Sequence, residues 1–220
     1  GLPQFSWEQA AIQLSREGAT WGPAFGSSAV VTYAFRSTAP STMPSDTGGF
    51  SRFSAAQITA AETALAMWAS LANITFVRAN DGDGYSNNAA ILFANYSSGA
   101  AGAAAFASLP VTANTSAASS QGDVWVNSTL SYNSNPVYGG YGPLVLIHEI
   151  GHALGLSHPA DYDASQGSPT YGADATYFND SLMFTVMSYF AETNTGGNQG
   201  IYPAAPLLHD ASGPASGGGL

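Results

Sequence analysis

The sequence predicts a fold that mixes helices and strands, of the α/β (α+β) class. Segments rich in β-branched and aromatic residues alternate with segments whose apolar residues recur every three to four positions. This alternation favours helices layered on a sheet over an all-β sandwich. The chain has 220 residues, of which 45% are hydrophobic and 12% aromatic, so we expect a single domain with a sizeable core.

The first two predicted helices begin at recognisable caps. Ser6 can cap a helix over residues 7–16, and Gln9 three positions later completes a capping box. The same Ser-x-x-Gln pattern at Ser54 predicts a second helix, which the spacing of its apolar residues extends to about Leu71.

A third helix is expected from Pro143, because the missing amide N–H of proline costs nothing in the first turn. Apolar residues occupy nearly every side of this helix, so it should be central and buried. Gly155 is well placed to end it, since glycine readily adopts the positive φ that such a turn requires.

Five segments are expected to be strands, because they are short, apolar and bounded by turn residues. They are residues 29–35, 74–77, 90–94, 103–110 and 124–126. The fourth lies in a stretch rich in Ala, Ser and Gly, a composition that is also typical of a flexible linker.

Charged residues are scarce and unbalanced. Only 8% of residues are charged, and four arginines against 14 acids give a net charge of −10. Nucleic acids and anionic membranes bind through Lys and Arg, so both are excluded as partners. No apolar run reaches the length of a spanning helix, which excludes membrane insertion, and the lack of cysteine excludes disulfides and thiolate metal sites.

Three of the four histidines lie close together in the sequence. Positions i and i+4 share one face of a helix, so His148 and His152 should point the same way. A turn at Gly155 lets His158 reach the same point. Three imidazoles with an open fourth position are typical of catalytic zinc. Glu149, next to the first histidine, can reach water at that position without being a ligand.

The alternative is an apolar helix that carries histidines by chance. It does not account for the glutamate and the glycine at the offsets that the chemistry requires. We therefore expect Zn²⁺ as the cofactor.

The histidine run resembles the HExxHxxGxxH pattern of the metzincins, and Pro159 after it is similar to the serralysin subfamily. A second segment, Thr185-Val186-Met187-Ser188-Tyr189, resembles the serralysin Met-turn. The resemblance covers about residues 5–210. It implies a metzincin fold in one domain: an N-terminal lobe (about 1–155) with a twisted, mixed five-stranded sheet and two long helices, an irregular C-terminal lobe (about 156–210), a cleft between them, and a flexible tail (211–220).

The resemblance also implies roles for particular residues. Met187 would form a floor beneath the histidines, and Tyr189 would bind zinc in the resting enzyme and then hydrogen-bond the oxyanion. Glu149 would be the general base. A strand at the edge of the sheet would pair with extended substrate by β-augmentation; its residues are Ala103, Ala104, Ala105, Phe106 and Ala107. Core packing for Met187 and Tyr189, and a linker or a covered strand for 103–107, are the open alternatives.

The chain departs from the serralysin pattern near its end. After Asp210 it has no Gly/Asp nonapeptide repeats, so calcium, which the resemblance allows, has no matching motif here. Six loop acids are expected to be solvated rather than calcium ligands: Asp81, Asp83, Asp161, Asp163, Asp174 and Asp180. The fourth histidine, His209, is expected at the surface.

Three functions remain open from the sequence. The first is a secreted, extracellular zinc endopeptidase that acts as a monomer on proteins or peptides, with a protein inhibitor left open as a further partner. The second is a zinc-binding but inactive secreted or cell-surface module. The third is an acidic structural surface protein without zinc. Glu149 and Tyr189 favour the first.

Overall fold

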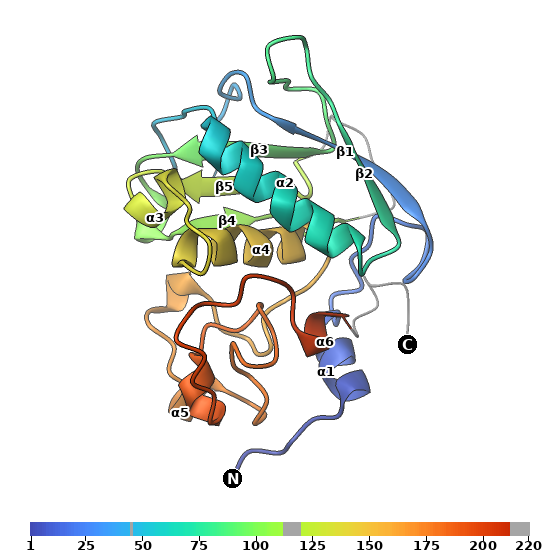
Figure 1. Ribbon diagram of the computed structural model, residues 1–220, viewed down its shortest axis with the longest axis vertical. Coiled ribbons are helices and arrows are strands. Elements are labelled where there is room, and N and C mark those ends of the chain that lie inside the picture. Colours follow the sequence, from blue (N-terminus) through green and yellow to red (C-terminus); the bar gives the residue numbers. More distant parts are fainter. Residues whose placement is uncertain (45, 112–119, 212–220) are drawn as a thin grey trace.

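The structure, a computed structural model, describes residues 1–44, 46–111 and 120–211 (Figure 1). The expected tail lies, apart from Ala211, outside the described residues.

The N-terminal part is built on one sheet whose strands follow the order β2-β1-β3-β5-β4. The strands are β1 (Ala29–Phe35), β2 (Ile74–Arg78), β3 (Ile91–Tyr96), β4 (Ala105–Ala107) and β5 (Val124–Asn127). The pairs β1–β2, β1–β3 and β3–β5 are parallel, and β4 is antiparallel to β5. The predicted mixed five-stranded sheet is confirmed, and β4 forms one of its edges.

Two long helices pack against each other beside this sheet, as Figure 1 shows. They are α2 (Ala55–Ala69) and α4 (Tyr141–Ala153), while α1 (Trp7–Leu14) lies in the lower part of the molecule. Both predicted capping boxes are present, at Ser6 and at Ser54. The remaining α-helices are single turns: α3 (Ser131–Ser134), α5 (Tyr171–Asp174) and α6 (Leu208–Ala211). The described residues also form three 3₁₀ turns: η1 (Ala100–Gly102), η2 (Ala164–Gln166) and η3 (Glu192–Thr195).

Helix α4 begins earlier than predicted, at Tyr141 rather than Pro143. Proline is therefore the third helical residue. Its missing N–H is tolerated there as well, because the first four amides of a helix have no partner within the helix.

The edge strand is shorter than predicted, and Ala103 and Ala104 precede it. Their carbonyls accept side-chain hydrogen bonds: Ala103 from Tyr96 and Asn127, and Ala104 from Asn133. These inward bonds fix the approach to β4.

Two predictions about polar residues were wrong. His209 is only 1% exposed, because α6 folds back against α1 and the imidazole stacks on Phe184 with ring centroids 5.4 Å apart. Asp180 is 0% exposed instead of solvated: two hydroxyl groups of the surrounding loops donate to its Oδ1, and its Oδ2 is buried without a hydrogen-bond partner among the described residues. The other five loop acids are exposed or partly exposed.

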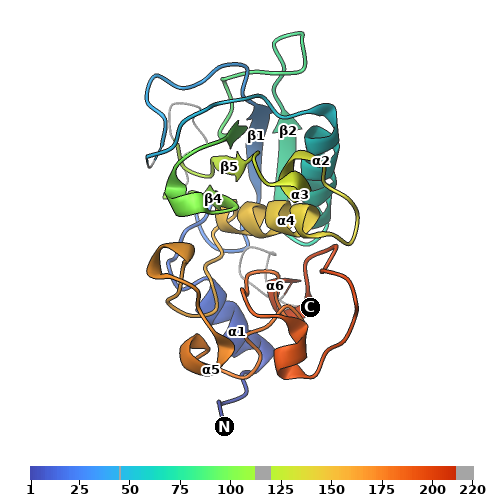
Figure 2. The same ribbon diagram turned by 90° about the vertical axis from the view of Figure 1, so that its left-hand side faces the viewer.

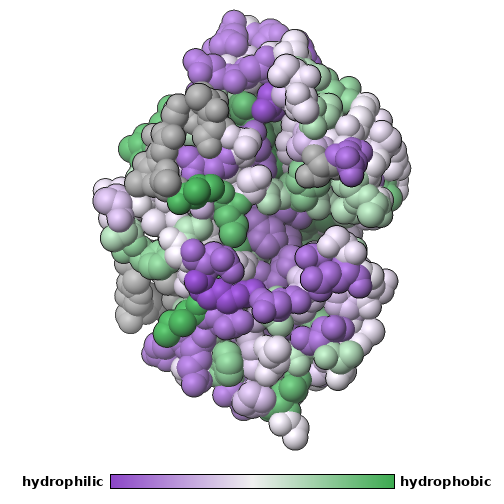
Figure 3. Space-filling view, turned by 180° about the vertical axis from the view of Figure 1, so that it is seen from behind, coloured by the Kyte–Doolittle hydropathy of each residue, from purple (hydrophilic) through white to green (hydrophobic). Residues whose placement is uncertain are grey.

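The chain after α4 forms the lower part of the molecule with few regular elements, and α1 joins it there (Figure 2). Between the two parts the surface is hollowed (Figure 3), where a cleft of about 900 Å³ is lined by residues of both, including Phe106 and His158. None of the helices in the described part of the chain has the length and hydropathy that a membrane span requires.

Candidate active site

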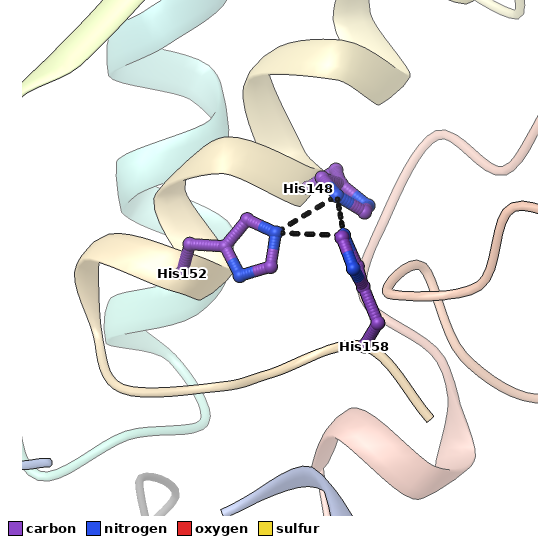
Figure 4. A group of neighbouring side chains, drawn as sticks. All are labelled: His148, His152 and His158. Atoms are coloured by element: carbon purple, nitrogen blue, oxygen red, sulfur yellow. Dashed lines mark hydrogen bonds between the residues drawn. The ribbon is translucent and has the colours of Figure 1, made fainter. Parts of the chain in front are cut away.

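The imidazoles of His148, His152 and His158 converge on one point (Figure 4). His152 and His158 line this cleft, and His148 lines the pocket that adjoins it at Glu149 and Tyr189. Their Nε2 atoms lie 3.0–3.2 Å from one another. Tetrahedral zinc with bonds of about 2.0–2.1 Å would hold two such nitrogens about 3.3 Å apart. The triangle of nitrogens therefore has the size of one face of a zinc site.

The second nitrogen of each ring is bound by a main-chain carbonyl. His148 Nδ1 lies 2.7 Å from Val186 O, His152 Nδ1 lies 2.7 Å from Leu156 O, and His158 Nδ1 lies 2.7 Å from Tyr162 O. A carbonyl only accepts, so each Nδ1 carries the hydrogen and donates it.

The three imidazoles are neutral. Burial lowers the pKa of His148 to about 3 and that of His158 to about 4, and it lowers the pKa of His152 well below its ordinary value. A neutral ring whose hydrogen is on Nδ1 presents a lone pair at Nε2. Three lone pairs within hydrogen-bonding distance repel one another unless a cation lies between them. The donor set and its geometry thus fit Zn²⁺.

Glu149 lies beside this group, on the next residue of α4. It is 7% exposed, and its Oε2 has no hydrogen-bond partner in the described structure. Burial raises the pKa of its carboxyl to about 8. A nearby cation favours the ionised form of a carboxyl, so a buried, unpartnered carboxylate at this position also fits a metal site.

Helix α4 is anchored to other elements at both ends of its histidine segment. Trp68 Nε1 of α2 donates to Ile147 O at 3.0 Å, and Trp21 Nε1 donates to Ala153 O at 2.7 Å. The chain then turns at Gly155, whose φ is +111° and where a Cβ would lie 2.2 Å from Ala19 O. Only glycine fits this turn without a shift of the backbone.

Met187 packs beneath the histidine helix. Its side chain is fully buried, and a Cβ on Gly151 would lie 2.5 Å from its sulfur. Gly151, the residue directly before His152, lets α4 approach Met187 closely. The carbonyl next to Met187, Val186 O, is the acceptor for His148.

Tyr189 lies beside the imidazoles, with its ring centroid 4.5 Å from that of His158 and 5.9 Å from that of His148. The residue is 38% exposed and lines the cleft. Burial and the nearby Glu149 raise the pKa of its phenol, which therefore remains a hydrogen-bond donor at neutral pH.

Helix α1 supports the loop that carries His158. Arg16 donates to His158 O at 2.6 Å and to Asp161 at 3.0 Å, and Gln13 donates to Pro159 O at 2.9 Å. Sequence reasoning did not identify Gln13, Arg16, Trp21, Trp68 or Tyr162 as supports of the site. Most of their hydrogen bonds go to main-chain carbonyls. Every residue has such a carbonyl, so the sequence does not indicate which one will be the acceptor.

A helix with two converging imidazoles and a buried glutamate, followed by a third imidazole after a glycine turn, defines a metal-dependent hydrolase. A sequence profile of the Metallo-peptidase family M12 matches residues 28–198. The chain therefore belongs to this metallopeptidase family.

Within the family the chain is similar to serralysins. It is 42% identical to the metallopeptidase AprA of Pseudomonas marginalis, over 96% of this chain and 44% of that protein. It is 40% identical to serralysin C of Dickeya chrysanthemi, over 96% and 43%, and 41% identical to a serralysin of Photorhabdus luminescens, over 93% and 42%. The chain spans less than half the length of these relatives.

Proposed function

We propose that the chain is the catalytic domain of a zinc endopeptidase that hydrolyses peptide bonds in proteins. The observation that carries this proposal is the convergence of three unprotonated Nε2 atoms beside the unpartnered carboxylate of Glu149. Zinc, when bound, lowers the pKa of water to about 7 and polarises a carbonyl. His148, His152 and His158 would hold it.

Glu149 would act as the general base. Its free Oε2 can accept the proton of the attacking water as that water adds to the peptide carbon. The same carboxyl can then deliver the proton to the nitrogen of the leaving amine.

Tyr189 would stabilise the oxyanion. Its protonated phenol lies at the cleft beside His158 and can donate a hydrogen bond to the oxygen on which charge develops. Resemblance to the serralysins further suggests that Tyr189 is a fourth ligand in the resting state.

The edge strand β4 would bind the substrate backbone. Ala104 O accepts from Asn127 N, and Ser108 N donates to Asp123 O, so alternate residues face β5. The N–H and C=O groups of Ala105 and Ala107 therefore point away from β5. They can pair with an extended peptide in the cleft, which Ala105, Phe106 and Ala107 line.

We also propose that the enzyme is secreted and acts as a monomer, and that the residues of this chain form one catalytic domain with lobes at about 1–155 and 156–210. The similarity to serralysins supports secretion, and the cleft lined by residues of both lobes supports the lobe boundaries. Calcium and a protein inhibitor remain expectations from that similarity.

A zinc-removal experiment tests the proposed function. The chain should cleave a peptide library, lose this activity with a chelator and regain it with one equivalent of Zn²⁺. A chain that binds zinc but cleaves nothing would instead be the inactive module. A chain that binds no zinc would contradict both functions.

A further inference from the structure

Asp180 is a buried carboxylate without a cation. It is 0% exposed, and the four ion pairs among the described residues do not include it. Burying such a group lowers stability unless its hydrogen bonds compensate. An apolar residue at this position would avoid that cost. The presence of an aspartate is therefore better explained if its hydrogen bonds hold neighbouring segments in place.

One oxygen of Asp180 joins two segments of the site. Its Oδ1 accepts from Tyr162 Oη at 2.8 Å and from Ser188 Oγ at 2.7 Å. Tyr162 follows the His158 loop, whereas Ser188 lies in the turn that carries Tyr189. The carboxylate therefore connects Tyr162, which supports His158, to Ser188, which supports Tyr189.

Tyr162 supports His158 in two ways. Its carbonyl accepts from His158 Nδ1 at 2.7 Å, and its ring stacks on the imidazole with centroids 5.4 Å apart and an angle of 12°. The same ring lies 5.1 Å from that of Tyr189. Because Asp180 fixes the hydroxyl of Tyr162, it also restrains the Tyr162 ring, which contacts both His158 and Tyr189.

Ser188 restrains Tyr189 from the main chain. Its hydroxyl donates to Asp180 and accepts from Phe190 N at 3.0 Å, so the two bonds span the backbone of Tyr189. All three of Asp180, Ser188 and Phe190 are buried. Rotation of the Tyr189 backbone would break at least one of these bonds.

We propose that Asp180 is a positioning residue of the metal site: by accepting the hydroxyls of Tyr162 and Ser188 on one oxygen, it fixes the His158 loop and the Tyr189 turn relative to each other. This proposal rests on the proposed function for the roles of zinc and Tyr189.

The test uses the zinc-loaded chain and variants that each remove one hydroxyl. Tyr162→Phe keeps the carbonyl and the ring that contact His158 but loses the hydroxyl bond to Asp180, so zinc affinity should weaken by about 10-fold, the lower end of the effect of losing a group that directly orients a metal ligand. Ser188→Ala should lower kcat by about 10-fold with little change in KM. Zinc affinity is measured by chelator competition, and stability by urea unfolding of the zinc-free proteins.

Tyr85→Phe is the matched control, because Tyr85 Oη donates to Phe53 O at 2.6 Å and Tyr85 does not line the cleft. It should cost similar stability, about 1 kcal/mol, yet leave zinc affinity within about twofold. Asp180→Asn keeps an accepting oxygen and should retain zinc better than Asp180→Ala.

Two results would overturn the proposal. One is equal zinc affinity in Tyr162→Phe and Tyr85→Phe, with kcat unchanged in Ser188→Ala. The other is an Asp180→Asn protein as impaired as Asp180→Ala. Zinc affinity is read without hydrolysis, so a chain that shows the expected affinities but cleaves no peptide would contradict the proposed function alone.

Discussion

Two of the hydrogen bonds that orient the three imidazoles are local, and one comes from a distant part of the chain. His152 is bound by Leu156 O within the motif itself, but His148 depends on Val186 and His158 on Tyr162. The motif therefore supplies the ligands and orients His152, whereas the orientation of His148 and His158 depends on carbonyls that follow the motif.

At the same scale, Tyr189 provides a prediction. Tyr189→Phe removes the phenolic donor but keeps the ring beside His158. Loss of one donor to an oxyanion costs on the order of 10² in kcat, so kcat should fall while KM changes little. Steady-state kinetics on a peptide substrate measures both. An effect confined to KM would argue against the oxyanion role.

The sequence predicted the residues that converge, because a helical spacing of four and a glycine turn are local properties. It did not predict the burial of Asp180 or His209. Both are polar residues outside helices or near the chain end, where exposure is the usual outcome. Their burial arises from segments that pack against one another although they are far apart in the sequence, as in the stacking of His209 of α6 on Phe184.

Among the secondary-structure elements, those with strong local signals were predicted best. The capping boxes at Ser6 and Ser54 set the starts of α1 and α2 correctly. The start of α4 was less certain from sequence, since proline fits several positions in the first turn. The short β4 could not be delimited, because its neighbours Ala103 and Ala104 are held by side chains from other elements.

The edge strand gives a prediction at this scale. Ala107→Pro removes an N–H that faces away from β5, and proline is tolerated at such positions of an edge strand. Substrate would lose one backbone hydrogen bond, worth about 1 kcal/mol, so KM should rise about fivefold. Urea unfolding should show little loss of stability. An unchanged KM in a stable variant would contradict pairing of substrate at this residue.

For the whole molecule, the scarcity of basic residues shapes the electrostatic field. Each arginine is engaged in an ion pair, and only the Arg36–Asp123 pair is well buried. Exposed pairs contribute about 0–1 kcal/mol each, so stability depends mainly on the packed core. The acids Glu17, Asp46, Glu149, Asp161 and Asp163 line the cleft with Arg16 as its basic residue, so we expect its field to be negative even with Zn²⁺ bound.

This field predicts a substrate preference. Peptides with Lys or Arg near the cleaved bond should have a higher kcat/KM than matched peptides with Asp or Glu. The ratio should fall as salt increases, because the Debye length is only about 10 Å at 0.1 M. The ratio is measured by comparing kcat/KM for a series of peptides that differ in charge, at low and at high salt. A preference for acidic peptides would contradict the expected field.

The most direct test of the account as a whole is the replacement of Glu149. Glu149→Ala removes the proposed general base but none of the three imidazoles, so the variant should bind one equivalent of zinc. Its casein hydrolysis should fall by at least about 10²- to 10⁴-fold, the usual contribution of general acid–base catalysis. Glu192→Ala, away from the histidines, is the matched control and should keep native activity. A Glu149→Ala protein that retains zinc and near-native turnover would contradict the account.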